Sequence, residues 1–228
     1  PVFFGKNPGE QQIVVGGIKS GQVNRKSWNE KARNIDVFDI KSDVIKTLME
    51  LGVDEKKMFV SDLTKASYHP GRSGSIALNS EKGPHLAYFG ELHPAIVKKL
   101  DFKDSNIFGF EIFLKNVPNP NKKVRHIKSN YNVSDFQKSE RDFAFVIDNS
   151  FKIGLLERLI KSVDENIIQK VSTFDVYEGE NIPKNKKSVA INVILQALDR
   201  TLNEKDLEQV SQKIIETVKE KTGAIIRS

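Results

Sequence analysis

An acid and an aromatic residue stand two positions apart in the stretch FDVYEGENIPKNKKSVAI, residues 174 to 191. If this stretch forms a strand, Asp175 and Tyr177 point to one face of the sheet, and Phe174 and Val176 point to the other. An exposed tyrosine ring can stack on a nucleobase, and a carboxylate can accept hydrogen bonds from the N–H groups of a base edge. The pair therefore suggests base recognition. The alternative interpretation is an edge-strand aromatic beside a solvated acid.

The loop that follows this pair is basic. Lys184, Lys186 and Lys187 stand within four positions of one another. Clustered lysines are suited to phosphate contacts, which release counterions and carry no base specificity. We expect these three side chains to contact phosphate, and the alternative is a merely solvated loop.

The pattern around these residues predicts a β-α-β-β-α-β unit. The expected elements are a strand at 141–148, a helix at 151–163, strands at 167–177 and 188–198, a helix after a capping box at 201–204, and a closing strand at 224–228. Gly223 stands where a helix C-cap glycine is expected. In this arrangement both helices pack on one face of the sheet, and the other face stays open.

The strand alternation then assigns side chains to the two faces. Phe174 and Val176 are expected to face the helices, as are the phenylalanines of RDFAFVID. The open face is expected to carry Asp175, Tyr177, Ala144 and Ser188. Small residues such as Ala144 leave room for a base to lie flat.

The first half of the chain mixes helices and strands. We expect a strand at 11–21, a helix within 36–53, a strand, turn and helix at 85–100, and a strand at 105–117. The absence of regular βαβ alternation favours an antiparallel α+β fold. Proline, asparagine and basic residues follow without an apolar period, which is typical of a linker. The predicted domains are residues 1–117 and 135–228, joined by a linker at 118–134.

Composition and motifs exclude several kinds of site. The 228 residues carry a net charge of +6 and contain no cysteine, so disulfides and cysteine-based sites are excluded and a reducing cytosol fits. No apolar run is long enough to span a membrane, and the chain opens without a signal segment, so we expect a cytoplasmic protein. YHPGRSGSI, residues 68–76, lacks the spacing of a phosphate-binding loop and is interpreted as a turn that Arg72 ties to a neighbour. His69 and His93 each precede a proline and are expected to be turn or capping residues. No catalytic or metal-binding set can be assembled from local spacing.

Motifs along the whole chain match one family in order. RDFAFVID, FDVYEG, DRTLNEKD and GAIIR resemble the ferredoxin-fold anticodon-binding domain that ends the beta subunit of bacterial phenylalanyl-tRNA synthetase. YHPGRSGSI, FGELHP and FEIFL look like the preceding domain of that subunit, a catalytic-like domain without catalysis. One departure is Glu140, which stands where the family often has proline. The expected fold class is α+β: a partial, antiparallel class II synthetase-like domain, then a ferredoxin-like βαββαβ domain.

The resemblance implies the tRNA-binding and subunit-assembly portion of a phenylalanine-tRNA ligase. That enzyme uses ATP and Mg²⁺ and is a heterotetramer of two alpha and two beta subunits, with the aminoacylation site in the alpha subunit. The class II signatures Gly-x-Gly-x-x-Arg and Phe-Arg-x-Glu do not occur here, so we expect this chain to be non-catalytic and to hold no cofactor. The surface that binds the tRNA(Phe) anticodon would be the open face with Ala144, Asp175, Tyr177 and Ser188. The phenylalanine anticodon begins with guanine, whose N1–H and N2–H₂ groups are donors.

Two other functions remain as alternatives. An independent RRM-like RNA-binding module would also present an open sheet, but the aromatic-rich strand signature of such modules is missing and the first half would have no role. A pure assembly scaffold would cover the sheet with protein. RNA binding without tRNA preference would favour the RRM-like module. Absence of RNA binding, with retained binding to an alpha subunit, would favour the scaffold.

Overall fold

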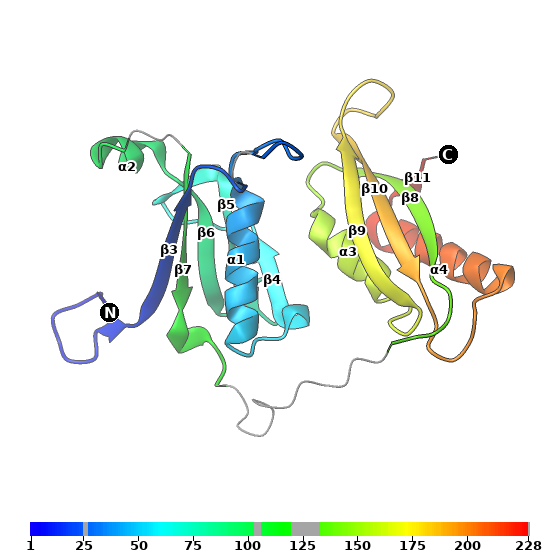
Figure 1. Ribbon diagram of the computed structural model, residues 1–228, viewed down its shortest axis with the longest axis horizontal. Coiled ribbons are helices and arrows are strands. Elements are labelled where there is room, and N and C mark those ends of the chain that lie inside the picture. Colours follow the sequence, from blue (N-terminus) through cyan, green and yellow to red (C-terminus); the bar gives the residue numbers. More distant parts are fainter. Residues whose placement is uncertain (25–26, 103–105, 120–132, 228) are drawn as a thin grey trace. The chain divides into compact units, whose positions relative to one another are not determined.

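The computed structural model describes residues 1–24, 27–102, 106–119 and 133–227 (Figure 1). The chain divides into two compact units, residues 1–128 and 129–228, and each has its own sheet and buried core. Most of the predicted linker at 118–134 lies outside the described residues. The domain limits at residues 117 and 135 therefore stay predictions.

The unit of residues 1–128 is built on an antiparallel sheet of five strands. In sheet order these are β3 (Val14–Ser20), β7 (Ile107–Phe113), β6 (His85–Leu92), β5 (Tyr68–Leu78) and β4 (Met58–Ser61). The unit also contains β1 (Val2–Phe3), β2 (Gln11–Gln12), α1 (Val37–Glu50), η1 (Glu55–Lys57), α2 (Pro94–Lys99) and η2 (Leu114–Asn116). The expectation of an antiparallel α+β architecture is confirmed.

Helix α1 covers one face of this sheet because its apolar residues recur every four positions. Ile40, Val44 and Leu48 are almost fully buried, and they pack into the same core as Ile76 and Ile112 of the sheet. Asp36 caps the helix by accepting hydrogen bonds from the backbone N–H groups of the first turn. The helix predicted within residues 36–53 is thus confirmed.

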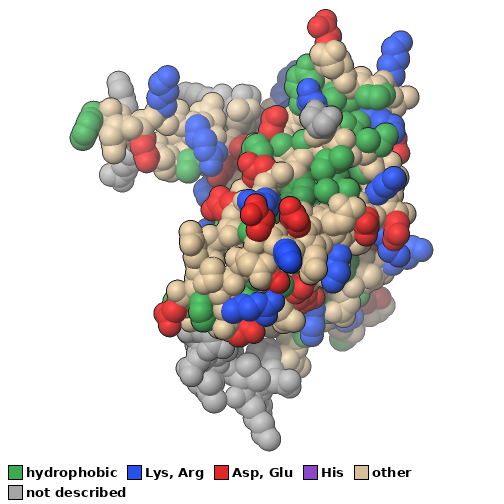
Figure 2. Space-filling view, turned by 90° about the vertical axis from the view of Figure 1, so that its right-hand side faces the viewer, with side chains coloured by type: hydrophobic (Ala, Val, Ile, Leu, Met, Phe, Trp, Pro, Cys, Tyr) green, Lys and Arg blue, Asp and Glu red, His purple; other side chains and the backbone are tan. Residues whose placement is uncertain are grey.

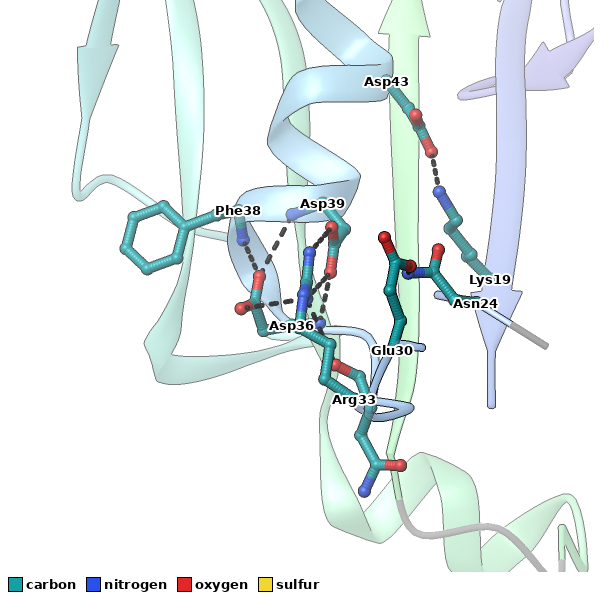
Figure 3. A network of polar contacts seen from close by, with 9 residues as sticks. Lys19, Asn24, Glu30, Arg33, Asp36, Phe38, Asp39 and Asp43 are labelled. Atoms are coloured by element: carbon teal, nitrogen blue, oxygen red, sulfur yellow. Dashed lines mark hydrogen bonds and ion pairs between the residues drawn. The ribbon is translucent and has the colours of Figure 1, made fainter. Parts of the chain in front are cut away.

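A network of polar contacts fastens the loop before α1 to the first turn of that helix (Figure 3). The guanidinium of Arg33 donates two hydrogen bonds of 2.7 Å to the carboxylate of Asp39. This hydrogen bonding lowers the pKa of Asp39 to about 2. Asp43 lies one turn after Asp39 in α1, and its carboxylate accepts a hydrogen bond of 2.7 Å from the amine of Lys19 in β3. These contacts connect β3, the loop and α1 along one side of the unit.

The stretch of residues 68–76 is not a turn, and that prediction is wrong. It lies within strand β5, whose pairing with β6 shifts register between Tyr68 and Ser73. The irregularity accommodates Pro70, which has no N–H to donate to a ladder. Arg72 does tie the stretch to a neighbour, because its guanidinium donates at 2.8 Å to the buried carboxylate of Glu91.

The two histidines that precede prolines have the local roles expected of them. The Nδ1 atom of His69 accepts a hydrogen bond of 3.0 Å from the backbone N–H of Gly71. The Nδ1 atom of His93 accepts one of 3.2 Å from the N–H of Ala95 and so caps α2. Pro94 occupies the first turn of that helix, where its missing N–H costs nothing.

The unit of residues 129–228 has the predicted β-α-β-β-α-β order. Its elements are β8 (Ser139–Asp148), α3 (Ile153–Lys161), β9 (Ile168–Tyr177), β10 (Lys186–Leu195), α4 (Glu204–Thr222) and β11 (Ile225–Ile226). The strands pair antiparallel in the order β11-β8-β10-β9. This is the ferredoxin-like arrangement, with both helices against one face (Figure 1).

The helix-facing side of this sheet forms the core of the unit. Phe143, Phe145 and Ile147 are buried there, as their alternation predicts, against apolar residues of α3 and α4. Gly223 ends α4 in the left-handed conformation with φ of 66°, which glycine adopts without steric cost.

The start of α4 differs from the prediction. The capping box is formed by Asn203 and Asp206, not by Thr201 and Glu204. The later start lets Leu202 and Leu207 bury together in the core on either side of the cap, in the positions of a hydrophobic staple.

The expectation that Phe174 faces the helices is also wrong. Asp175 pairs with Ala190 and Thr173 pairs with Ile191, which leaves Phe174 as the extra residue of a β-bulge. Its side chain is 60% exposed. Val176 pairs with the buried Val189 and so lies on the helix-facing side. Because it is near the end of the strand, its side chain is still 43% exposed.

Candidate nucleic-acid interface

One row of four residues crosses the open face next to the β9–β10 hairpin. Ser188 pairs with Tyr177 on one side and with Val146 on the other, and Val146 pairs with Ile225. Directly paired residues point to the same side of a sheet. Tyr177 and Ser188 are therefore brought together on the face without helices. Ser188 is only 5% exposed, so larger side chains around it shield it in the free protein.

The adjacent row places two alanines between two charged residues. Ala190 pairs with Asp175 on β9 and with Ala144 on β8. The backbone N–H of Arg227 donates to the carbonyl of Ala144 at 2.7 Å, which sets Arg227 beside Ala144 at the other edge. Because neighbouring strands lie about 4.8 Å apart, the two alanines form a low floor wide enough for a flat ring.

The tyrosine ring is positioned by the hairpin that follows it. Its hydroxyl donates to the carbonyl of Glu180 at 3.4 Å. Gly179 packs against the hydroxyl end of the ring, since a Cβ atom placed there would lie 2.6 Å from the Tyr177 oxygen. The ring is 41% exposed, so part of its surface stays available for stacking.

An arginine approaches the same ring from the far edge of the sheet. The Cζ atom of Arg227 lies over the Tyr177 ring, 6.0 Å from its centroid. Neither Arg227 nor Ala190 was among the residues predicted for this face. Ala190 could have been found from its spacing of two from Ser188. Arg227 could have been found from its spacing of two from Ile225, but only once the strand pairing was known.

The three lysines of the hairpin do not gather on one face. Lys184 is exposed in the loop, and Lys186 is opposite Asp148 on the open side of the sheet. Lys187 has the parity of the helix-facing side, and its amine donates to the carbonyl of Asn149 at 2.8 Å. Phosphate contact by these lysines stays a prediction, with Lys184 and Lys186 in the better positions.

The two ends of the open face differ in character. The exposed hydrophobic side chains of this face, Tyr177 and Ile225, lie at the hairpin end, and Val176 and Ile226 are exposed at the same end on the helix-facing side. Figure 2 views this unit from its side and shows hydrophobic side chains gathered below the projecting tip, with acidic and basic side chains further down. At the other end Asn192 donates to Asp142 at 2.8 Å, near Glu140. The hairpin end carries Lys184 and Lys186, which can contact phosphate, and the partly exposed Tyr177 ring, which can stack on a base, and these favour it as the place for a nucleic acid.

Neither a metal centre nor a membrane span is found in the described part of the chain. Its histidines, aspartates and glutamates form no group of three or more that could hold a metal ion. None of its helices is long and apolar enough to cross a membrane.

Comparison with known families agrees with this geometry. Residues 134–227 match the ferredoxin-fold anticodon binding domain, which together with the sheet order makes this unit an anticodon-binding module of the ferredoxin fold. Residues 1–114, half of the chain, match the phenylalanyl tRNA synthetase beta chain CLM domain. The chain belongs to the phenylalanyl-tRNA synthetase beta chain family.

Curated relatives carry the name phenylalanine–tRNA ligase beta subunit. The protein of Paramagnetospirillum magneticum is 36% identical over 227 residues, and that of Bartonella henselae is 39% identical over 230 residues. The protein of Rhodospirillum rubrum is 36% identical over 228 residues. These alignments cover 99 to 100% of this chain but 28% of each relative, so the chain spans little more than a quarter of their length.

Proposed function

We propose that the open sheet face of residues 129–228 binds the anticodon stem-loop of tRNA(Phe), within a phenylalanine-tRNA ligase. The observation that carries this proposal is the match of residues 134–227 to an anticodon-binding domain whose open face presents Tyr177 and Asp175 in adjacent rows. Among the functions considered, this one accounts for both halves of the chain. An RRM-like module or a scaffold leaves one of the two family matches unexplained.

Each residue of the face has a chemical role in this proposal. The Tyr177 ring stacks on an anticodon base, and the Asp175 carboxylate accepts hydrogen bonds from the base edge. A carboxylate repels phosphate, so an acid in an RNA site serves base reading. Ala144 and Ala190 form the floor, and the Ser188 hydroxyl offers a donor or acceptor once it is uncovered. Lys184, Lys186 and Lys187 contact phosphate.

The first unit has a different role in the proposal. We assign residues 1–117 to part of a class II synthetase-like domain that does no catalysis and contributes to assembly with the alpha subunit. The match of residues 1–114 to the beta chain CLM domain supports this assignment. ATP and Mg²⁺ act at the alpha subunit of a heterotetramer of two alpha and two beta subunits. The enzyme works in the cytoplasm, where its tRNA is found.

Introducing a carboxylate on the alanine floor tests the proposal. Ala144→Glu, made in the full-length beta chain and assembled with its alpha subunit, should weaken tRNA(Phe) binding by at least about tenfold, because a charged side chain blocks the floor and repels the RNA. Exchange of pyrophosphate into ATP in the presence of phenylalanine should not change, since adenylate formation requires no tRNA.

Gln209→Glu is the matched control, because it adds the same charge on an exposed position of α4, on the opposite side of the sheet. Gln209→Glu should leave both tRNA(Phe) binding and pyrophosphate exchange unchanged. Unchanged tRNA binding by a folded Ala144→Glu enzyme would refute the proposed interface.

A further inference from the structure

Two aromatic rings and a carboxylate form a corner on the side of the five-stranded sheet that α1 does not cover. Tyr88 of β6 pairs directly with Glu111 of β7, so both side chains point to the same side. The chain neighbours of Tyr88, Ala87 and Phe89, belong to the core under α1, which places Tyr88 and Glu111 on the opposite side. The ring of Phe113 meets the Tyr88 ring edge to face, with centroids 5.8 Å apart and an interplanar angle of 85°.

The ammonium group of Lys65 occupies this corner of Tyr88, Glu111 and Phe113. Lys65 belongs to the loop of residues 62–67, between β4 and β5. Its Nζ atom donates a hydrogen bond of 2.7 Å to Glu111 and lies 4.9 Å from the Tyr88 centroid and 4.5 Å from the Phe113 centroid. Aromatic faces and a carboxylate are the groups that bind ammonium ions in proteins.

Two polar atoms beside the corner have no hydrogen-bond partner among the described residues. They are the hydroxyl oxygen of Ser75, which pairs with Tyr88, and the Nδ1 atom of His85, whose ring centroid lies 5.4 Å from that of Tyr88. Ser75 is completely buried. Buried polar atoms without a partner cost stability, so their presence needs a reason beyond packing. A polar ligand that enters beside the corner would supply the missing partners.

We propose that Tyr88, Glu111 and Phe113 form a binding site for a small compound with a primary ammonium group, and that Lys65 closes this site by occupying it. The site lies in the first unit and is independent of the proposed anticodon interface.

Lys65 is placed to leave the corner without disturbing the sheet. Its side chain has a flexible four-carbon stem and is 38% exposed. The loop has its own attachments, because the Ser73 hydroxyl donates to the Thr64 oxygen at 2.7 Å and the Tyr68 N–H donates to the Lys65 carbonyl at 3.0 Å. The ammonium group can therefore withdraw into solvent while the loop backbone stays in place.

The tether of Lys65 sets the concentration at which a free amine can compete. A group held by a short flexible link has an effective concentration in the millimolar range. A dilute amine with no further contacts therefore does not displace Lys65, and the site is closed in the wild-type chain. Removal of the Lys65 side chain opens it.

The test uses the full-length beta chain assembled with its alpha subunit, and n-butylammonium chloride as the probe, because this ion reproduces the end of a lysine side chain. Lys65→Ala should raise amide exchange rates in β6 and β7 roughly 3- to 10-fold. n-Butylammonium should restore slow exchange, with half of the effect at roughly 1 to 50 mM, as expected for a ligand of so few atoms. Exchange in the wild type should not change, because Lys65 already fills the corner. Lys65→Ser takes the place of Lys65→Ala if that variant does not assemble.

Lys19→Ala is the matched control. Lys19 also donates at 2.7 Å to a carboxylate, that of Asp43, and its side chain is also 38% exposed, but it lies on the side of the sheet that α1 covers. n-Butylammonium should not slow exchange in this variant. Sodium chloride and n-butanol at equal concentration control for salt and for the apolar chain, and Glu111→Gln added to Lys65→Ala should abolish the response.

Three results would overturn the proposal. An equal response of Lys19→Ala, or an equal response to n-butanol, would show that the corner does not select an ammonium group. No response of an assembled Lys65→Ala or Lys65→Ser ligase would show that the corner is not a binding site. A response of the wild type as large as that of Lys65→Ala would show that Lys65 does not close the site. Each of these results leaves the anticodon interface standing.

Discussion

Replacing Tyr177 by alanine should weaken binding of tRNA(Phe) by about 1 to 3 kcal/mol, which is roughly 5- to 150-fold in affinity. The ring lies on the face without helices and is 41% exposed, so its loss removes a stacking surface and little of the core. Binding titrations should therefore show a large change, while thermal unfolding followed by circular dichroism should show a small one. Unfolding of the unit without a specific loss of binding would contradict the assignment of this face.

Two glycine variants control for this result without removing the ring. Gly179→Ala should also weaken binding, because its Cβ atom would lie 2.6 Å from the Tyr177 oxygen and displace the flexible end of that side chain. Gly154→Ala, in α3, meets nothing within 4 Å and should leave binding unchanged. Equal binding by both variants would mean that the position of the ring is unimportant.

Gly90→Ala should cause a large loss of stability in the unit of residues 1–128. Gly90 has φ of +151°, and a Cβ atom there would lie 2.5 Å from the Cα atom of Ser73 on the paired strand. Backbone strain costs about 1 to 3 kcal/mol, and overlap inside a packed sheet adds a similar amount. The overlapping atoms are the Cβ and Cα of Ser73 and the carbonyl oxygen of Arg72, and none of them can move without a shift of the backbone.

Hydrogen exchange, read strand by strand, measures this loss in one unit without assuming a two-state transition for the whole chain. Amides of β5, β6 and β7 should lose protection in Gly90→Ala, while those of β8 and β10 should keep it. Gly16→Ala, in β3 of the same sheet, makes only an ordinary contact of 3.5 Å and should preserve protection throughout. Normal protection in Gly90→Ala would show that this position does not need glycine.

Strand alternation was sufficient to predict the core and the open face of the second unit. The phenylalanines of RDFAFVID are buried because a period of two places them on one side of a strand, whatever its neighbours are. The same rule placed Asp175 and Tyr177 on one face. The bulge at Phe174 could not be predicted this way, because an extra residue is visible only in the pairing of β9 with β10.

Features that depend on distant pairing were missed for the same reason. Arg227 and Tyr177 are 50 positions apart in the sequence. They meet because β11 and β9 belong to one sheet and both side chains reach across its open face. Two overlapping capping patterns precede α4, and burial of Leu202 and Leu207 together selects the later one. The three lysines are close in sequence and were predicted to act as one cluster. Lys186 and Lys187 are the first two residues of β10, however, and consecutive strand residues point to opposite faces of the sheet.

The most direct test of base reading by the open face is to exchange guanosine for inosine at the first anticodon position and to compare binding by the wild-type ligase and by Asp175→Asn. Inosine lacks the N2 amino group, so a carboxylate that reads this group should make wild type prefer guanosine by roughly tenfold or more, as expected for a hydrogen bond to a charged group. Asp175→Asn should bind the two stem-loops with nearly equal affinity. An equal preference for guanosine in both proteins would show that Asp175 does not read this base and would contradict base recognition by the open face.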